Sequence, residues 1–351
     1  MSLAPAEFTP ETTYLNTASH GLPPARAVAA VREAQDRWAA GRGAPPVQDH
    51  LVPELRAGFA RLMTGATAED IALGGTVSAL IAPVASALPA GAEVLVAEGE
   101  FASVTMPFLF RGDLAVRTVP LERLAADVRP ETALVAVSVV QSADGRIADT
   151  ALLRAATRAN GAKLLLDSTQ AAGWYPLDFA DADYWVCATF KWLVGARSVA
   201  FFAASPAAAA DLRPVGPGWY AAEDRWAELY NPIALPTGTR RFDQTPDWIG
   251  VIAARAALEL LDELTIDKIH AHNLALAGRF RAGARALGYQ PIEQSSAIVA
   301  IPGAGTAENR LEQAEVLASA RAGGLRFSFH LYNSDADVEH ALAALGEHHD
   351  S

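Results

Sequence analysis

Short apolar runs alternate with segments of helical periodicity between residues 71 and 203, and this alternation constrains the fold more than any other feature of the chain. One apolar run begins at residue 71, and the later runs are residues 93–97, 114–119, 133–140, 163–167, 184–187 and 199–203. The helical segments include residues 76–88, 121–128 and 149–160. Such alternation is typical of a mostly parallel sheet with helices on both faces, which binds ligands beyond the carboxyl ends of its strands.

The segments on either side of this region predict a second, smaller unit. Apolar residues at helical spacing predict two helices, 25–40 and 53–63, before the sheet, and residues 204–247 form a proline-rich excursion after it. A long helix over 248–287, broken near Thr265, precedes strands at 297–301 and 325–329 and helices at 311–322 and 336–345. We therefore predict a large α/β domain over 17–247 and a small α+β domain over 1–16 and 248–351.

Charge and cysteine content limit the partners. Forty acidic residues against 28 basic ones give a net charge of −12. The sequence contains no dense Lys/Arg stripe, so binding to nucleic acid or to an anionic membrane is not expected. Cys187 is the single cysteine, so neither an internal disulfide nor a multi-cysteine metal site is expected, and no metal is predicted. A reducing cytoplasm is the expected compartment, and the first residues lack the basic and apolar regions of a signal peptide.

Two strand ends carry side chains that could take part in catalysis. Asp167 and Gln170 follow the strand 163–167, and Lys191 follows the strand 184–187 between two aromatic residues. A desolvated lysine has a lowered pKa and acts as a Schiff-base nucleophile. Asp167 as a helix cap and Lys191 as a surface lysine are the alternatives, and the order and spacing of the two residues favour a shared site.

This pattern resembles the fold-type I pyridoxal-phosphate (PLP) enzymes, and more narrowly aminotransferase class V, the group that contains cysteine desulfurases, isopenicillin N epimerase and kynureninase. The similarity rests on Asp-x-x-Gln at one strand end and Thr-Phe-Lys at the next, and it extends from residues 14–21 to residues 326–333. It implies a large mostly parallel sheet domain with a small C-terminal α+β domain, PLP as cofactor, and a homodimer with shared active sites.

The resemblance also implies roles for individual residues. Lys191 would attach PLP through a Schiff base and move protons at the substrate α-carbon, and Asp167 would keep the pyridinium nitrogen protonated. Gln170 would bond the ring's phenolic oxygen. Phe101 would cover the ring and Ser142 would be a polar neighbour, with core packing and a plain turn serine as the alternatives.

The phosphate is expected at a helix start. Gly75 and Thr76 lie between a strand and an apolar helix, where this family holds the phosphate, and an ordinary Thr helix cap is the alternative. The chain departs from the desulfurase pattern, which has serine and histidine where this sequence has Ala188 and Phe190. Their replacements are predicted to be Thr189 and a residue of the neighbouring subunit's loop, one of Arg240, Arg241 or Thr245.

Substrate binding is predicted at both ends of the chain. Arg326 resembles the arginine that clamps an amino-acid carboxylate, and a surface charge at a strand edge is the alternative. Asn16 and His20 are expected in the same pocket, although His20 also suits a turn. Trp219 and Tyr220 either shape the side-chain pocket or pack at an interface.

The motif leaves the reaction open, because racemisation, transamination and β-elimination all start from loss of the α-proton. A desulfurase that forms a persulfide needs a mobile cysteine, whereas Cys187 lies in a predicted buried strand. We therefore expect a β-eliminating lyase acting on a cysteine-derived or similarly substituted α-amino acid. An aminotransferase or epimerase is the alternative, and a non-catalytic relative of the same fold is the alternative of another class.

Overall fold

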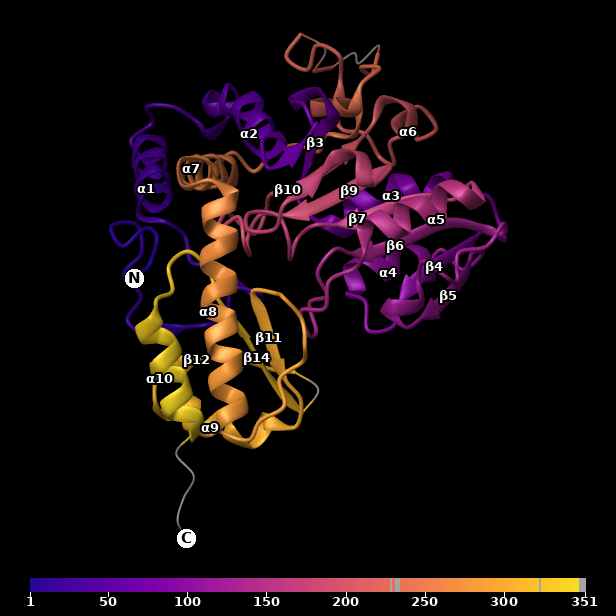
Figure 1. The fold of residues 1–351 in the computed structure, drawn as a ribbon. Coiled ribbons are helices and arrows are strands. Elements are labelled where there is room, and N and C mark those ends of the chain that lie inside the picture. Colours follow the sequence, from indigo (N-terminus) through magenta and orange to yellow (C-terminus); the bar gives the residue numbers. More distant parts are fainter. Residues whose placement is uncertain (228, 231–233, 322, 347–351) are drawn as a thin grey trace.

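The computed structural model describes residues 1–227, 229–230, 234–321 and 323–346 (Figure 1). Its centre is a seven-stranded sheet with the strand order β3-β10-β9-β7-β6-β4-β5. Every neighbouring pair in this sheet is parallel except the two that involve β10. The strands are β3 (Ile71–Gly74), β4 (Glu93–Ala97), β5 (Ala115–Val119), β6 (Thr132–Ser138), β7 (Lys163–Asp167), β9 (Tyr184–Ala188) and β10 (Ala200–Ala204).

Helices bury both faces of this sheet. Alternate residues of one strand point to opposite faces, so each strand contributes to both layers of the core. Leu134 and Ala136 of β6 pack with helices α3 (Val77–Ala87) and α4 (Ala102–Leu109). Val135 and Val137 face the other cluster, which includes residues of α2 (Leu51–Ala60), α5 (Thr150–Asn160) and α7 (Trp248–Leu264). The predicted doubly covered, mostly parallel sheet is confirmed.

A smaller three-stranded sheet, with the order β11-β14-β13, lies beside the long helix α8 (Ile266–Ala286), as Figure 1 shows. Its strands are β11 (Ile298–Ile301), β13 (Ser319–Arg321) and β14 (Gly324–Ser328), and helices α9 (Glu308–Gln313) and α10 (Asp335–Gly346) pack around it. The predicted break in the long helix is confirmed at Thr265, whose φ of 67° lies in the left-handed region and separates α7 from α8.

The remaining elements are short or lie near the N-terminus. Helix α1 (Ala25–Ala39) packs against α7, and α6 (Pro206–Ala210) follows β10. Two pairs of two-residue strands complete the structure: β1 (Thr13–Tyr14) with β12 (Val316–Leu317), and β2 (Met63–Thr64) with β8 (Leu177–Asp178). None of the helices that the structure describes is both long enough and apolar enough to cross a membrane.

Two helix predictions were wrong. The segment predicted as a helix over 121–128 is a single 3₁₀ turn, Leu121–Arg123, followed by further turns. In the helix predicted over 311–322, α9 ends at Gln313, and Glu315 then takes a positive φ of 55°. The chain continues as β12 and β13, which pair with β1 and β14, and Ala322 lies outside the described residues. Pairing with distant strands outweighed local helical periodicity here.

Candidate active site

The carboxyl ends of five parallel strands meet at one cavity. The loops after these strands supply its walls, as expected for an open sheet of this kind. Seven residues predicted for the site line it: Gly75 and Thr76 after β3, Phe101 after β4, Ser142 after β6, Asp167 and Gln170 at the end of β7, and Lys191 after β9. The topology therefore brings together residues that lie as much as 116 positions apart, from Gly75 to Lys191.

Lys191 is the amine of the cavity. Only 6% of the residue is exposed, and its Nζ lies 4.9 Å from the centre of the Phe101 ring and 5.8 Å from that of Phe190. Burial lowers the pKa of Lys191 to about 8, and the opposing influence of the Asp167 carboxylate is smaller. The lowered pKa gives this amine a larger neutral fraction near neutral pH than an exposed lysine has, which favours its action as a nucleophile.

Asp167 is a buried carboxyl group in the same cavity, 4% exposed. Its Oδ1 accepts a hydrogen bond from the backbone N–H of Thr169 at 2.8 Å. Burial raises the pKa of Asp167 to about 6, the Thr169 hydrogen bonds act against the rise, and the nearby Glu100 adds to it. A carboxylate in this position is costly by itself and is stabilised by a cationic group placed against it.

Gln170 is held rigidly between the two strand ends. Its Oε1 accepts a hydrogen bond from the indole Nε1 of Trp192 at 2.7 Å. Its Nε2 donates to the carbonyl of Ala18 at 2.9 Å and to Oγ of Ser142 at 2.8 Å. The carbonyl of Trp192 in turn lies 2.9 Å from Nε2 of the buried His330. The amide is thus fixed with its donors toward Ser142.

Arg326 continues this chain of contacts on the other side of Ser142. Its Nη1 donates to the carbonyl and to Oγ of Ser142, and its Nη2 donates to Oγ of Ser19 at 2.7 Å. The residue is 2% exposed, its Nε is buried without a hydrogen-bond partner, and burial lowers its pKa to about 10. Among the described residues no carboxylate forms an ion pair with it. Arg326 is therefore a buried cation that lacks a counter-ion.

The start of helix α3 forms another wall of the cavity. Thr76 caps the helix by accepting a hydrogen bond from the N–H of Ala79 at 3.3 Å. The first N–H groups of a helix have no partner within it and attract anions. The N–H of Gly75 donates instead to Oε1 of Gln244 at 3.0 Å. Gln244 belongs to the proline-rich excursion and was not predicted, because its sequence neighbourhood contains no phosphate-binding motif.

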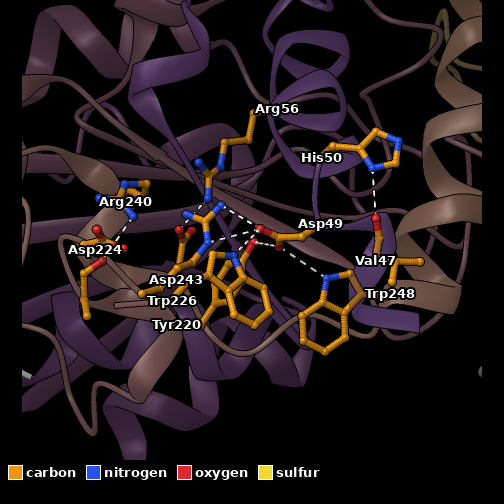
Figure 2. Close-up of polar contacts among 12 residues, drawn as sticks. Val47, Asp49, His50, Arg56, Tyr220, Asp224, Trp226, Arg240, Asp243 and Trp248 are labelled. Carbon is orange, nitrogen blue, oxygen red and sulfur yellow. Dashed lines mark hydrogen bonds and ion pairs between the residues drawn. The ribbon is translucent and has the colours of Figure 1, made fainter. Parts of the chain in front are cut away.

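Figure 2 shows the polar cluster that fixes the excursion beside α2. The carboxylate of Asp49 accepts hydrogen bonds from four side chains, those of Tyr220 at 2.5 Å, Arg225 at 2.9 Å, and Trp226 and Trp248 at 3.3 Å each. Burial alone would raise the pKa of Asp49, but the hydrogen bonds from Tyr220, Arg225 and Trp248, together with the charge of Arg225, outweigh it and lower the pKa. The carboxylate thus ties the excursion to the turn before α2.

A second set of contacts holds the excursion against β3, beside the cavity. Asp243 pairs with the buried Arg56 and accepts a hydrogen bond from the N–H of Leu73 in β3 at 2.8 Å. The next residue, Gln244, donates its own N–H to the carbonyl of Leu73 at 2.8 Å. The excursion therefore positions the Gln244 side chain against Gly75.

Two predicted substrate residues lie close to the cavity without lining it. The exposed His20 places its ring 5.5 Å from that of Phe190, and its neighbour Gly21 packs so tightly that a Cβ there would lie 2.0 Å from the Lys191 carbonyl. Asn16 forms a bridge with Ser328, and its buried Oδ1 has no hydrogen-bond partner. The N-terminal segment thus forms the margin of the site.

The predicted replacements for the phosphate contacts lie outside the cavity lining of this single chain. The single O–H of the buried Thr189 lies within hydrogen-bond distance of two carbonyls, that of Ala196 at 2.5 Å and that of Val199 at 3.1 Å. Thr245 is exposed. The guanidinium groups of Arg240 and Arg241 donate to backbone carbonyls of their own chain. The hydroxyl of Thr189 is therefore already engaged within its own turn.

Trp219 and Tyr220 also lie outside the lining. The Trp219 ring packs 5.4 Å from that of Tyr220 and 5.2 Å from that of Trp226. The Tyr220 hydroxyl is bound to Asp49. In the single chain, both residues therefore serve to anchor the excursion.

The comparison with known proteins agrees with this geometry. Residues 48–289, more than half of the chain, match the model of the family Aminotransferase class-V. The chain belongs to this family, whose members are PLP-dependent enzymes. The predicted family, fold class and cofactor are therefore confirmed.

Individual relatives cover most of the chain. The uncharacterised aminotransferase YcbU of Bacillus subtilis is 28% identical over 302 residues, which cover 81% of this chain and 80% of that protein. A kynureninase of Deinococcus radiodurans is 26% identical, with 76% and 70% covered. The solved structure of the cystine C-S lyase C-DES with cysteine persulfide superposes with a TM-score of 0.87 at 20% identity, covering 96% of this chain and 98% of that one, so the two share a fold.

Proposed function

We propose that this enzyme is a lyase that eliminates a sulfur-containing group from the β-carbon of an α-amino acid. The observation that carries the proposal is the placement of the buried cation Arg326, which lacks a counter-ion, against Ser142 in the wall of a cavity that contains Lys191 and Asp167. The cavity fits PLP, because it offers a buried amine, a buried carboxyl group, an aromatic ring and a helix start. The structurally similar protein C-DES is a cystine C-S lyase, which supports the choice of reaction.

Each residue then has a defined task. Bound PLP supplies an aldehyde for attachment and a ring that withdraws electrons from the substrate α-carbon. Lys191 would hold the cofactor through its Nζ and, once free, would accept the proton from the substrate α-carbon. Asp167 would keep a proton on the ring nitrogen, and Phe101 would pack against the ring. The Ser142 hydroxyl, which lies between Gln170 and Arg326, would be a polar neighbour of both cofactor and substrate.

A sulfur acceptor on the protein is not needed for this reaction. Cys187 is fully buried in β9, and burial raises the pKa of its thiol strongly. A protonated, enclosed thiol is a poor nucleophile. This supports direct release of the sulfur group and weighs against transfer to a cysteine of the chain.

The reaction predicts its products. An S-substituted cysteine and water would give pyruvate, ammonium and the free thiol or persulfide in equal amounts. We expect purified protein, tested with a panel of S-substituted cysteines and cystine, to release pyruvate and ammonium in a 1:1 ratio. A keto acid that retains its sulfur substituent would instead establish an aminotransferase, and inverted substrate would establish an epimerase. Protein without bound cofactor and without turnover would point to the non-catalytic relative.

Replacing Arg326 by lysine tests the carboxylate clamp. Lysine keeps the charge but loses the bidentate geometry, so we expect the apparent KM for the amino acid to rise about tenfold or more, equivalent to about 1.4 kcal/mol or above. The absorbance of the bound cofactor should stay unchanged, as should turnover of an amine without the carboxylate. The exposed Arg321, which also donates to Oγ of Ser19 at 3.3 Å, provides the matched control Arg321→Lys. An equal KM in wild type and Arg326→Lys would place the carboxylate elsewhere.

The oligomeric state, the domain division and the compartment of the enzyme are also proposals. We propose a two-fold homodimer in which Thr245 or one of Arg240 and Arg241 completes the neighbouring site. Large apolar side chains left exposed on the excursion support an interface there: Val215, Trp226, Leu229, Tyr230 and Leu235. We further propose that residues 17–247 form the large domain, that 1–16 and 248–351 form the small one, and that the enzyme acts in the cytoplasm.

A further inference from the structure

The phosphate end of the cavity lacks the serine and histidine of the desulfurase pattern, since Ala188 and Phe190 occupy their positions. Arg197 lines this cavity together with Phe190, Gly75 and Thr76, and it is a second basic side chain there besides Lys191. It follows Lys191 by six residues, in the turn between β9 and β10, and no motif in the sequence identified it.

The turn that carries Arg197 packs against the predicted phosphate loop. The carbonyl of the next residue, Ser198, lies 3.8 Å from the position that a Cβ on Gly75 would take. The Arg197 guanidinium lies over the ring of Phe190, 4.6 Å from its centre. Stacking of this kind fixes the plane of a guanidinium and leaves its N–H edge free to bind an anion.

The charge of Arg197 is available for a ligand. Many arginines in this chain pair with a carboxylate or donate to carbonyls, whereas Arg197 forms no ion pair or side-chain hydrogen bond within the part of the chain that the structure describes. Its charge acts on groups in and beside the cavity. It is the next influence after burial that lowers the pKa of His20, and the smallest of the influences on the pKa of Lys191, which burial lowers first. A dianionic phosphate at the start of α3 would face this cation directly.

We propose that Arg197 binds the phosphate group of PLP, and that the stacked pair of Phe190 and Arg197 replaces the serine and histidine of the desulfurases. The guanidinium would donate two hydrogen bonds to phosphate oxygens from one side, while the N–H groups at the start of α3 donate from the other. This inference rests on the proposed cofactor site. It removes the need for Thr189, whose hydroxyl is bound to carbonyls of its own turn.

The experiment compares two forms of the cofactor in the same protein. Cofactor-free wild type and Arg197→Ala are titrated with PLP and with pyridoxal, which lacks the phosphate, and binding is followed by the absorbance of the bound form. We expect Arg197→Ala to raise the Kd for PLP about tenfold or more, because a charge-assisted bond is lost, and to leave the Kd for pyridoxal within about twofold. High salt should reduce the difference between the two proteins, since Arg197 is exposed.

Controls separate this role from a structural one. Arg158→Ala, on the exposed end of α5, removes a charge of the same kind away from the cavity and should leave both Kd values unchanged. Phe190→Leu removes the stacking ring, so the effect of Arg197→Ala should be smaller in that background. An unchanged thermal unfolding midpoint would show that each variant is folded.

Two results would overturn the inference. The first is an unchanged Kd for PLP in Arg197→Ala; if the KM for substrates that bear a second anionic group were raised at the same time, Arg197 would be assigned to the substrate. The second is equal weakening of PLP and pyridoxal, which would indicate a general structural effect. If wild type itself bound neither PLP nor pyridoxal, the proposed function would fail with it.

Discussion

Lys191→Arg is expected to abolish turnover and to leave no cofactor covalently attached after borohydride reduction. The guanidinium keeps the positive charge, but it stays protonated and cannot form the bond to an aldehyde. The wild-type amine, with a pKa that burial lowers to about 8, should react faster as the pH rises through about 8, because the neutral fraction increases. Peptide mapping of the reduced wild-type protein should find the pyridoxyl group on Lys191.

The chain offers well-matched controls because it contains only two other lysines, Lys163 and Lys268. Lys163 lies at the opposite end of β7 from Asp167, where its Nζ is 3.8 Å from an oxygen of Asp183. Lys163→Arg and Lys268→Arg should therefore retain both attachment and turnover. A pyridoxyl group found on either residue in the wild type would refute the model of the site.

Asp167→Asn is expected to reduce turnover by two or more orders of magnitude while the cofactor remains bound through Lys191. Asparagine keeps the shape of the side chain but cannot hold the proton on the ring nitrogen with a full negative charge. Steady-state kinetics measure the loss, and the absorbance spectrum reports that the cofactor is present. Near-normal turnover would mean that another group protonates the ring.

Thermal unfolding of cofactor-free Asp167→Asn shows whether this variant is folded. Burial raises the pKa of Asp167 to about 6, above the unfolded value of about 4, so the folded apoprotein binds the extra proton between these values and loses stability as the pH rises through them. Above pH 6 the buried carboxylate is a destabilising charge, which asparagine removes. The cofactor-free Asp167→Asn protein should therefore unfold at a temperature no lower than wild type at pH 7 to 8. A lower midpoint would attribute the lost turnover to misfolding.

Local sequence determined the elements on which the site is built. Most of the strand ends that bear chemistry were predicted within one or two residues, because fully buried parallel strands are short apolar runs between helical segments, and 93–97 and 163–167 match β4 and β7 fully. Lys191, Asp167 and Gln170 could be selected because their spacing along successive strands forms a family pattern. Arg326 was selected in the same way, from its setting near the end of the chain.

Tertiary structure decided what surrounds these residues. Asp49, Gln244 and Arg197 have no local signal, since each acquires its partner from a segment far away in the chain or across a turn. The segment after Gln313 became β12 and β13 because β1 and β14 offered unpaired backbone groups, which helical periodicity does not register. The physical reason is common to both cases. The free energy of a strand pair, a buried carboxylate or a stacked guanidinium depends on the partner that the fold brings alongside. A short stretch of sequence contains the group itself but not that partner.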